Sequence, residues 1–240
     1  MNVLNALKGL FKGKGGTDVD DFNITDSAVS STMRSATSLW WDAFQGQLPF
    51  AQTHKNFKPL PVAYTSTAYL AQLVTGEIKF EIADDELNRH VQKNLLPNLD
   101  RIVQQTLVGG YTVIKPYFVQ SGEMFFDSGT SRDFLPLALD ENGHITEGVF
   151  FERIRYHGKI YERREHHIFR NGVHTVRNTA YIYGTKHAVE LATVPKWAVL
   201  LPEGQIPSTI PMIATFRTPY ANNIDLDSEL PISCLLYTSD

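Results

Sequence analysis

Histidine has the widest chemical range of the side chains in this sequence, because it can serve as a general base or as a metal ligand. The eight histidines are His54, His90, His144, His157, His166, His167, His174 and His187. His166 and His167 are neighbours in a stretch typical of a β-strand, so their side chains point to opposite faces and cannot chelate one ion together. His174, across the Asn171-Gly172 turn, could face one of them. Without a His-Glu-x-x-His or two-histidine-plus-carboxylate spacing, we expect surface or interface histidines and no metal site.

The other motifs with chemical potential are incomplete. Asn223, Asp225 and Asp227 alternate like the start of a calcium loop, but Ser228 and Cys234 stand where glycine and glutamate belong. The lysine-glycine string at 9–16 lacks the order of a phosphate-binding loop, and the sequence has no Gly-x-Ser-x-Gly elbow. Cys234 is the one cysteine, which excludes a disulfide framework and indicates a reducing compartment. We therefore expect no catalytic residues and no cofactor, and thus a protein that is not an enzyme.

Basic residues gather in one part of the chain. Between Val149 and Arg177, seven basic residues stand against three acidic ones, a local net charge of +4 in a chain of net −4. Arg163 and Arg164 are adjacent, so both faces of the expected strands carry charge and cannot cover a core along their whole length. Three interpretations are open: a solvated hairpin with cross-strand Glu–Arg pairs, a subunit interface, or phosphate contact. The candidate interface or DNA-facing residues, called the basic ribbon below, are Arg153, Arg155, Lys159, Arg163, Arg164 and Arg170.

The composition is that of a globular protein. The 240 residues are 42% hydrophobic and 20% charged, which excludes wholesale disorder and collagen-like sequence. The net charge of −4 gives no general basic excess for nucleic acid. The longest apolar runs, such as 197–201, are far shorter than the roughly 18 residues of a membrane span. We expect a soluble, cytosol-type protein without a membrane partner.

Residues 1–24 are expected to form an amphipathic arm and tether. The apolar positions at near-helical spacing are Val3, Leu4, Leu7, Leu10 and Phe11. Lys8, Lys12 and Lys14 lie between or after them, and the glycine-rich string 13–16 suits a flexible tether. Lys8 interrupts the apolar part before it reaches the length of a signal peptide. A membrane-surface helix is an alternative, but we favour an arm that docks on its own protein or on a neighbouring subunit.

Helical periodicity dominates residues 25–110. Asp26 is expected to cap a first helix that runs from about Val29 to Phe44, with Gly46 at its end. Trp40 and Trp41 cannot share one stripe, so one of them must face a second surface. Further helices are expected at 65–74, from Asp84 or Asp85 to 95, and from Pro97 to 107, with a loop at 47–61 and a short strand at 79–82.

After Gly110 the apolar period changes from that of a helix to that of a strand. The expected strands are 111–119, 124–127, 134–139, 145–156, 160–170 and 173–183. From 195 to 231 six of the twelve prolines fall in 37 residues, so we expect an extended crossing with one edge strand at 212–216. The predicted fold class is α+β, with N-terminal helices followed by an antiparallel β-meander.

Six segments together resemble the N-terminal half of a tailed-bacteriophage portal protein of the Firmicute-phage type. They are 38–46 (SLWWDAFQG), 95–99 (LLPNL), 109–117 (GGYTVIKPY), 134–138 (FLPLA), 142–150 (NGHITEGVF) and 219–228 (PYANNIDLDS). The last string is the most specific, and the ordered set is stronger than any single member. The resemblance assigns the chain mostly to the portal wing, with a helical part at 25–110, a β-rich part at 111–218 and an extended lead-in to the stem at 219–233.

The resemblance implies a structural protein without enzymatic activity. Portal subunits form a homo-oligomeric ring, typically a dodecamer, at the unique vertex of the virion, and they assemble in the host cytoplasm. Double-stranded DNA passes through the ring during packaging and ejection. The implied partners are the terminase large subunit, the head-tail adaptor, and the scaffold or major capsid protein.

The sequence departs from the family pattern at its end. Portal chains continue past the last string into stem, clip and crown, whereas residues 234–240 (CLLYTSD) look like translated sequencing-adapter read-through. We therefore expect a fragment whose last seven residues are foreign. Two other functions remain as alternatives: another head-tail connector or minor capsid protein, and a histidine-dependent hydrolase or nuclease.

Overall fold

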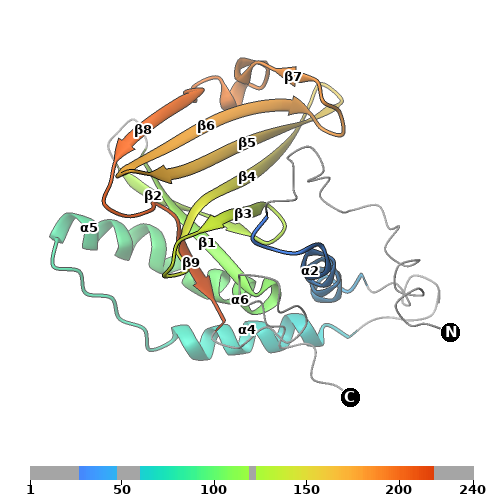
Figure 1. Ribbon diagram of the computed structural model, residues 1–240. Helices are drawn as coiled ribbons and strands as arrows, with labels where there is room; N and C mark the ends of the chain where they lie inside the picture. Colours follow the sequence, from blue (N-terminus) through green and yellow to red (C-terminus); the bar gives the residue numbers. More distant parts are fainter. Residues whose placement is uncertain (1–26, 48–59, 119–122, 219–240) are drawn as a thin grey trace.

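The computed structural model describes residues 27–47, 60–118 and 123–218, and they form an α+β fold, as predicted. Helices come first in the chain, and two antiparallel sheets follow (Figure 1). The expected arm and tether at 1–24, the lead-in at 219–233 and the tail at 234–240 lie outside the described residues.

The first described helix is α2, Ser31–Phe44. Its cap is Ser30, whose hydroxyl accepts a hydrogen bond from the N–H of Met33 (3.1 Å). The expected cap, Asp26, lies outside the described residues, while Gly46 has the positive φ of +69° that a helix end favours. Trp40 enters the main core, and the indole N–H of Trp41 donates to Ser131 (3.1 Å) on the other side. The prediction that the two tryptophans serve different surfaces is confirmed.

The remaining helices form one layer beneath the sheets (Figure 1). Helix α4 spans Val62–Thr75, and α5, Asp85–His90, continues through a π-helical turn (Val91–Leu95) and a 3-10 turn (Leu96–Asn98) into α6, Leu99–Gly109. Asp84 caps α5 by accepting from the N–H of Leu87 (2.8 Å), and Gly110 ends α6 at a φ of +83°. The expected strand at 79–82 is wrong, because this backbone pairs with no strand of either sheet and links α4 to α5.

The strands divide between two sheets. The smaller sheet has the order β2-β1-β9, with β1 at Tyr111–Phe118, β2 at Met124–Thr130 and β9 at Ala214–Arg217. The larger sheet follows the chain as a meander through β3 (Phe134–Leu139), β4 (Ile145–Tyr156), β5 (Lys159–Arg170), β6 (Val173–Ile182) and β7 (Ala188–Val189). A further strand, β8 (Glu203–Pro207), also pairs with β6. The first predicted hairpin therefore leaves the meander and joins β9, which confirms the edge strand expected near 212–216.

Tight turns fix the register of the long strands. Asn171 and Gly172 both have positive φ, +52° and +74°, as the sequence predicted for this hairpin. His157 and Gly158 adopt the same combination between β4 and β5. Strand β8 was not predicted, because its five residues lack a strand-like apolar pattern and their pairing with β6 is a long-range contact.

Two apolar clusters support this arrangement. The main core lies between α2 and the sheets, and its members include Met33, Trp40, Val113, Ile145 and Phe150. The second cluster, Tyr161, Ala180, Val194 and Trp197, is covered by the 3-10 turns Leu191–Thr193 and Pro195–Trp197. The space between the two sheets, next to Phe150, is filled by polar side chains instead.

Candidate functional site

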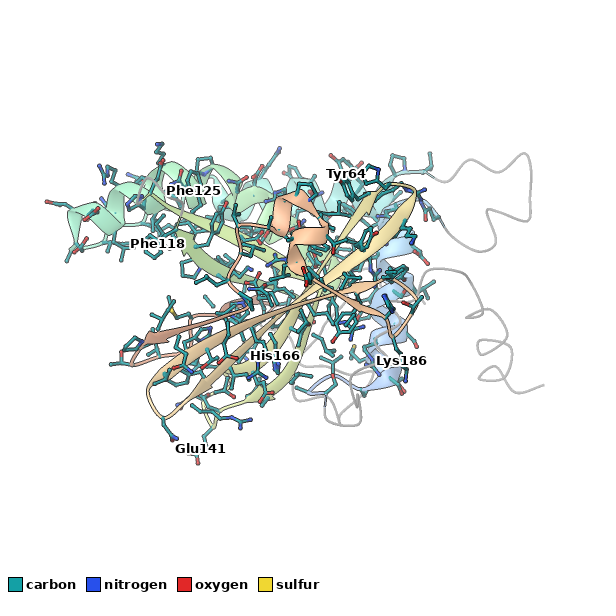
Figure 2. The ribbon with its side chains drawn as sticks, turned by 90° about the horizontal axis from the view of Figure 1, so that it is seen from above. Tyr64, Phe118, Phe125, Glu141, His166 and Lys186 are labelled. Atoms are coloured by element: carbon teal, nitrogen blue, oxygen red, sulfur yellow. The ribbon has the colours of Figure 1, made fainter. Side chains whose placement is uncertain are left out.

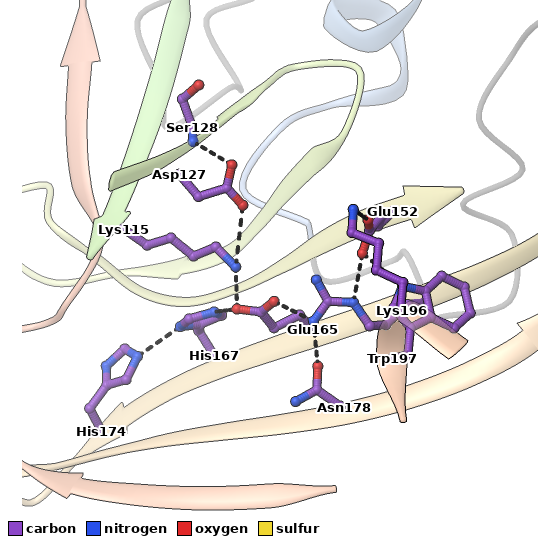
Figure 3. A network of polar contacts seen from close by, with 11 residues as sticks. Lys115, Asp127, Ser128, Glu152, Glu165, His167, His174, Asn178, Lys196 and Trp197 are labelled. Carbon is purple, nitrogen blue, oxygen red and sulfur yellow. Dashed lines mark hydrogen bonds and ion pairs between the residues drawn. The ribbon is translucent and has the colours of Figure 1, made fainter. Parts of the chain in front are cut away.

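A buried ion pair joins the two sheets (Figure 3). Lys115 of β1 reaches the carboxylate of Glu165 on β5, and the two side chains are only 7% and 10% exposed. The ammonium group also lies 4.5 Å from the centre of the Phe150 ring and 3.8 Å from a carboxylate oxygen of Asp127. Burying two charges is tolerated only where they are paired and hydrogen-bonded, so this contact fixes how the sheets face each other.

Two histidines extend the ion pair into the larger sheet. His167 Nε2 lies 2.7 Å from Glu165, and His167 Nδ1 lies 2.8 Å from His174 Nε2. The backbone N–H of Met212 points at His174 Nδ1 (3.4 Å). Because a backbone N–H can only donate, His174 carries its proton on Nε2 and donates to His167, which in turn donates from Nε2 to Glu165. Two neutral imidazoles thus satisfy every contact in the series.

Burial and charge set the protonation states of this group. Burial lowers the pKa of His167 despite the opposing effect of its hydrogen bond to Glu165, and burial together with the neighbouring His167 lowers the pKa of His174 to about 4. Burial alone would raise the pKa of Glu165. The hydrogen bond from His167 and the charges of Lys115 and Arg163 outweigh it, and hold that pKa well below its usual range. At neutral pH the carboxylate is ionised and both histidines are neutral.

Arg163 connects Glu165 to Glu152 on β4 and, through Glu152, to the turn at 195–197. Its guanidinium donates to Glu165 (2.7 Å), to the amide oxygen of Asn178 (2.8 Å) and to Glu152 (3.0 Å). Glu152 in turn accepts from Lys196 (2.5 Å) and from the indole of Trp197 (2.9 Å), as Figure 3 shows. The network thus runs from β1, across β5, to the turn at 195–197. Lys115 and Glu165 are 50 residues apart in the chain, and no local spacing pointed to them.

The chemistry open to this network is limited by its geometry. A carboxylate that orients a histidine is one half of many acid-base devices. Here the second histidine, His174, is 1% exposed and both of its ring nitrogens are hydrogen-bonded. A general base must reach the proton that it removes from a substrate. The arrangement therefore suits the positioning of the two sheets, not proton transfer to a bound molecule.

Most of the basic ribbon is paired with glutamates of the same sheet. On one face of β4 and β5, Arg153 and Arg164 both donate to Glu162, each at 2.9 Å. Their guanidinium groups also lie over tyrosine rings, 4.1 Å from the centre of Tyr183 and 4.4 Å from the centre of Tyr181. Arg153 meets Glu162 across the two strands, whereas Arg164 and Glu162 both belong to β5. The cross-strand pairing of one interpretation is therefore present in part, but the side chains of Arg164 and Glu162 are buried and not solvated.

The other ribbon residues separate into two groups. Arg163 belongs to the buried network, and Arg170 donates to Glu147 (2.8 Å), which also contacts His166 (3.0 Å). Arg155 and Lys159 are exposed beside the His157-Gly158 turn and have no ion pair within the described residues. The structure therefore does not gather the six residues into one basic surface.

Helix α4 exposes several bulky apolar side chains. Val62, Tyr69 and Leu73 follow one another at helical spacing and are about three-fifths exposed (61%, 61% and 59%). The opposite side of the helix presents the small buried residues Thr67 and Ala71 to the protein. Figure 2 shows Tyr64 of the same helix on the helical side of the molecule, away from His166 on the large sheet. A helix with its bulky apolar side facing outward is typical of an interaction surface.

The segment 199–210 around β8, called the second surface below, also exposes apolar side chains along its length. Its exposed members are Val199, Leu201, Ile206 and Ile210. In Figure 1 β8 runs along the top of the molecule, and α4 lies at the bottom. The two surfaces differ in their backbone, one helical and the other extended, and they are too far apart to cover each other.

Comparisons with known proteins name no relative. No family model matches the sequence, and no curated protein matches it. In the described part of the chain, no group of three or more histidine, cysteine or acidic side chains is placed to hold a metal ion. None of the helices in that part of the chain is long and apolar enough to cross a membrane.

Proposed function

We propose that this chain is part of a structural subunit of a tailed-phage portal ring, mostly its wing. The observation that carries the proposal is the pair of unlike apolar surfaces at opposite ends of the molecule, α4 and the segment at 199–210. A cyclic ring is built from head-to-tail contacts, so each subunit needs two different surfaces. In the ring, the two surfaces of each copy would face its two different neighbours.

The strings behind the family resemblance support the same function through their structural roles. Gly109 leaves the space beside Ser131 and Trp41 that a larger residue would fill, and Gly110 ends α6 at the start of β1. Gly148 of β4 leaves the space into which the ring of Phe134 packs. These positions shape the join between helices and sheets, as expected of a body that holds its surfaces in a fixed relation.

The proposal includes the partners and the location that the family implies. The ring would stand at the portal vertex of the virion, contact the terminase large subunit, the head-tail adaptor and the scaffold or major capsid protein, and pass double-stranded DNA. Four of the six residues of the basic ribbon are paired with glutamates of the sheet. Of the six, Arg155 and Lys159 are the ones we propose to contact such partners.

Electron microscopy of the protein encoded by the full reading frame that contains this chain tests the proposal. We expect ring-shaped particles, and we expect Leu201→Glu in the second surface to abolish them while the circular dichroism spectrum is unchanged. Asn142→Glu, which adds the same single charge at an exposed turn, is the matched control and should leave the rings intact. Monomers only, at all concentrations tested, would contradict the proposal.

A further inference from the structure

Helix α4 combines two properties that are unusual for a helix facing solvent. Its 14 residues contain no charged side chain, and its bulky apolar residues face outward while Thr67 and Ala71 face inward. A surface helix normally turns its apolar side to the core and its charged side to water. The reversed arrangement leaves Val62, Tyr69 and Leu73 without cover from the described part of the chain.

The chain that follows α4 adds a strong negative charge. Between 76 and 86 there are five acidic residues and one lysine, a local net charge of −4, and all five acids are exposed. Asp84 caps α5 and Glu86 contacts Arg89, whereas Glu77 and Glu81 follow the end of α4 by two and six residues. A ligand for this surface should therefore have an apolar face with positive charge toward one end.

The N-terminal segment of the same sequence has these properties. Residues 1–16 contain three lysines and no acid, a net side-chain charge of +3, and the lysines follow the first apolar residues. A helix over the first dozen residues would be about 18 Å long, close to the roughly 21 Å of α4. Length, apolar spacing and charge are thus complementary between this arm and the α4 surface.

We propose that the outer face of α4 and the adjacent acidic segment bind residues 1–16 of a neighbouring copy of this chain. This inference rests on the proposed ring, which supplies the neighbour. Each chain has one arm and one α4 face, so head-to-tail exchange fills every face once a ring closes. The arm is linked through ten residues to Ser27, which is anchored to the carbonyl of Pro136 (3.4 Å).

A mixing experiment with two intact but defective chains tests the exchange. Leu73→Glu places a charge in the apolar face of α4 that receives the arm. The double variant Leu7→Glu/Phe11→Glu places two charges in the apolar positions of the arm and is called the arm-defective chain. By analytical ultracentrifugation we expect each variant alone to be monomeric, and their equimolar mixture to form a dimer, since one partner supplies the arm and the other the face. Gln72→Glu adds the same charge beside the apolar stripe of α4 and should self-associate like the unmodified chain.

Binding of a synthetic peptide of residues 1–16 to the arm-defective chain gives a second readout. We expect affinity to fall at least tenfold with Leu73→Glu and to fall as salt is raised, because lysines face acids. The inference is overturned if the peptide does not bind to the arm-defective chain. It is also overturned if the unmodified chain is monomeric and does not bind the peptide, because its own arm would then occupy α4 within one chain. Rings without peptide binding refute this inference alone, whereas peptide binding and dimers without rings refute the portal proposal alone.

Discussion

Acidification should weaken the fold through His174, and the effect can be sized from its surroundings. His167 of β5 contacts this histidine and links it to Glu165 and Lys115, and the backbone N–H of Met212 points at its other nitrogen. Its pKa in the folded chain is about 4, against an ordinary 6.5. As the pH falls from 6.5 toward 4, the unfolded chain binds a proton that the folded chain does not, so the folded state loses stability.

The expected magnitude follows directly. Within this window, each unit by which the pH falls lowers the free energy of unfolding by about 1.4 kcal/mol. Between pH 7 and pH 5 the total decrease should be about 2 kcal/mol, because the titration of the unfolded chain begins near pH 6.5. The lowered pKa of His167 acts in the same direction, and Glu165 contributes only at lower pH, where its carboxylate is protonated in the unfolded chain. The raised pKa of Asp133 has the opposite sign, but it acts equally in a variant that lacks His174.

Urea denaturation followed by tryptophan fluorescence at pH 7 and pH 5 measures this difference. His174→Gln keeps an amide that can donate to His167, and it removes the titrating group, so its stability should depend less on pH by about 2 kcal/mol. The exposed His187 offers the matched control, since His187→Gln should leave the pH dependence unchanged. An equal loss of stability in the unmodified chain and in His174→Gln would refute the assignment of a neutral, buried His174.

Three further predictions use the same urea assay at pH 7. Lys115→Met should lower the free energy of unfolding by about 3 kcal/mol, because Glu165 loses its buried partner. Lys159→Met, at an exposed position, should change the free energy of unfolding by less than about 0.5 kcal/mol. Equal effects of the two substitutions would contradict the network. Gly148→Ala places a methyl group against the Phe134 ring and should lower the free energy of unfolding by about 1–3 kcal/mol. The methyl group of Gly204→Ala meets open space, so this control should not change the stability. If Gly148→Ala is also neutral, the packing of Phe134 against Gly148 is contradicted. Ser30→Ala should cost about 1 kcal/mol through the lost helix cap, and Ser35→Ala within α2 is its control.

The order and type of the elements could be predicted because they depend on local signals. The change of period at Gly110 separates helices from strands, and the Asn171-Gly172 turn fixes the register of β5 against β6. What could not be predicted depends on distant partners. Strand β9 pairs with β1 about a hundred residues earlier, which draws the β1–β2 hairpin out of the meander. The short strand at 79–82 was wrong because alternation alone does not supply a partner strand.

The candidate sites show the same division. The excess of charge at 149–177 was visible in the sequence, but the register decides which glutamate each arginine meets, as in the contact of Arg163 with Glu152. The sequence placed His174 within reach of one of two neighbouring histidines, and the structure identifies it as His167. Lys115 could not be found from spacing, because its partner lies on another sheet. Which side of α4 faces outward was also hidden, since an uncharged helix gives no polar face to read.

The buried charges and the exposed apolar helix have one explanation in common. Helix α4 packs on α6, which leads into β1, while the segment at 199–210 extends from β8 beside β6. The Lys115–Glu165 network is the polar link between these two halves, and it favours the orientation in which the pair forms, because any other would leave a buried charge without its partner. On the proposed function this orientation matters, because a head-to-tail ring closes only if every subunit presents its two surfaces at the same angle. A subunit held together by apolar contacts alone could be as stable, but small rotations between its sheets would add up around the ring and prevent closure.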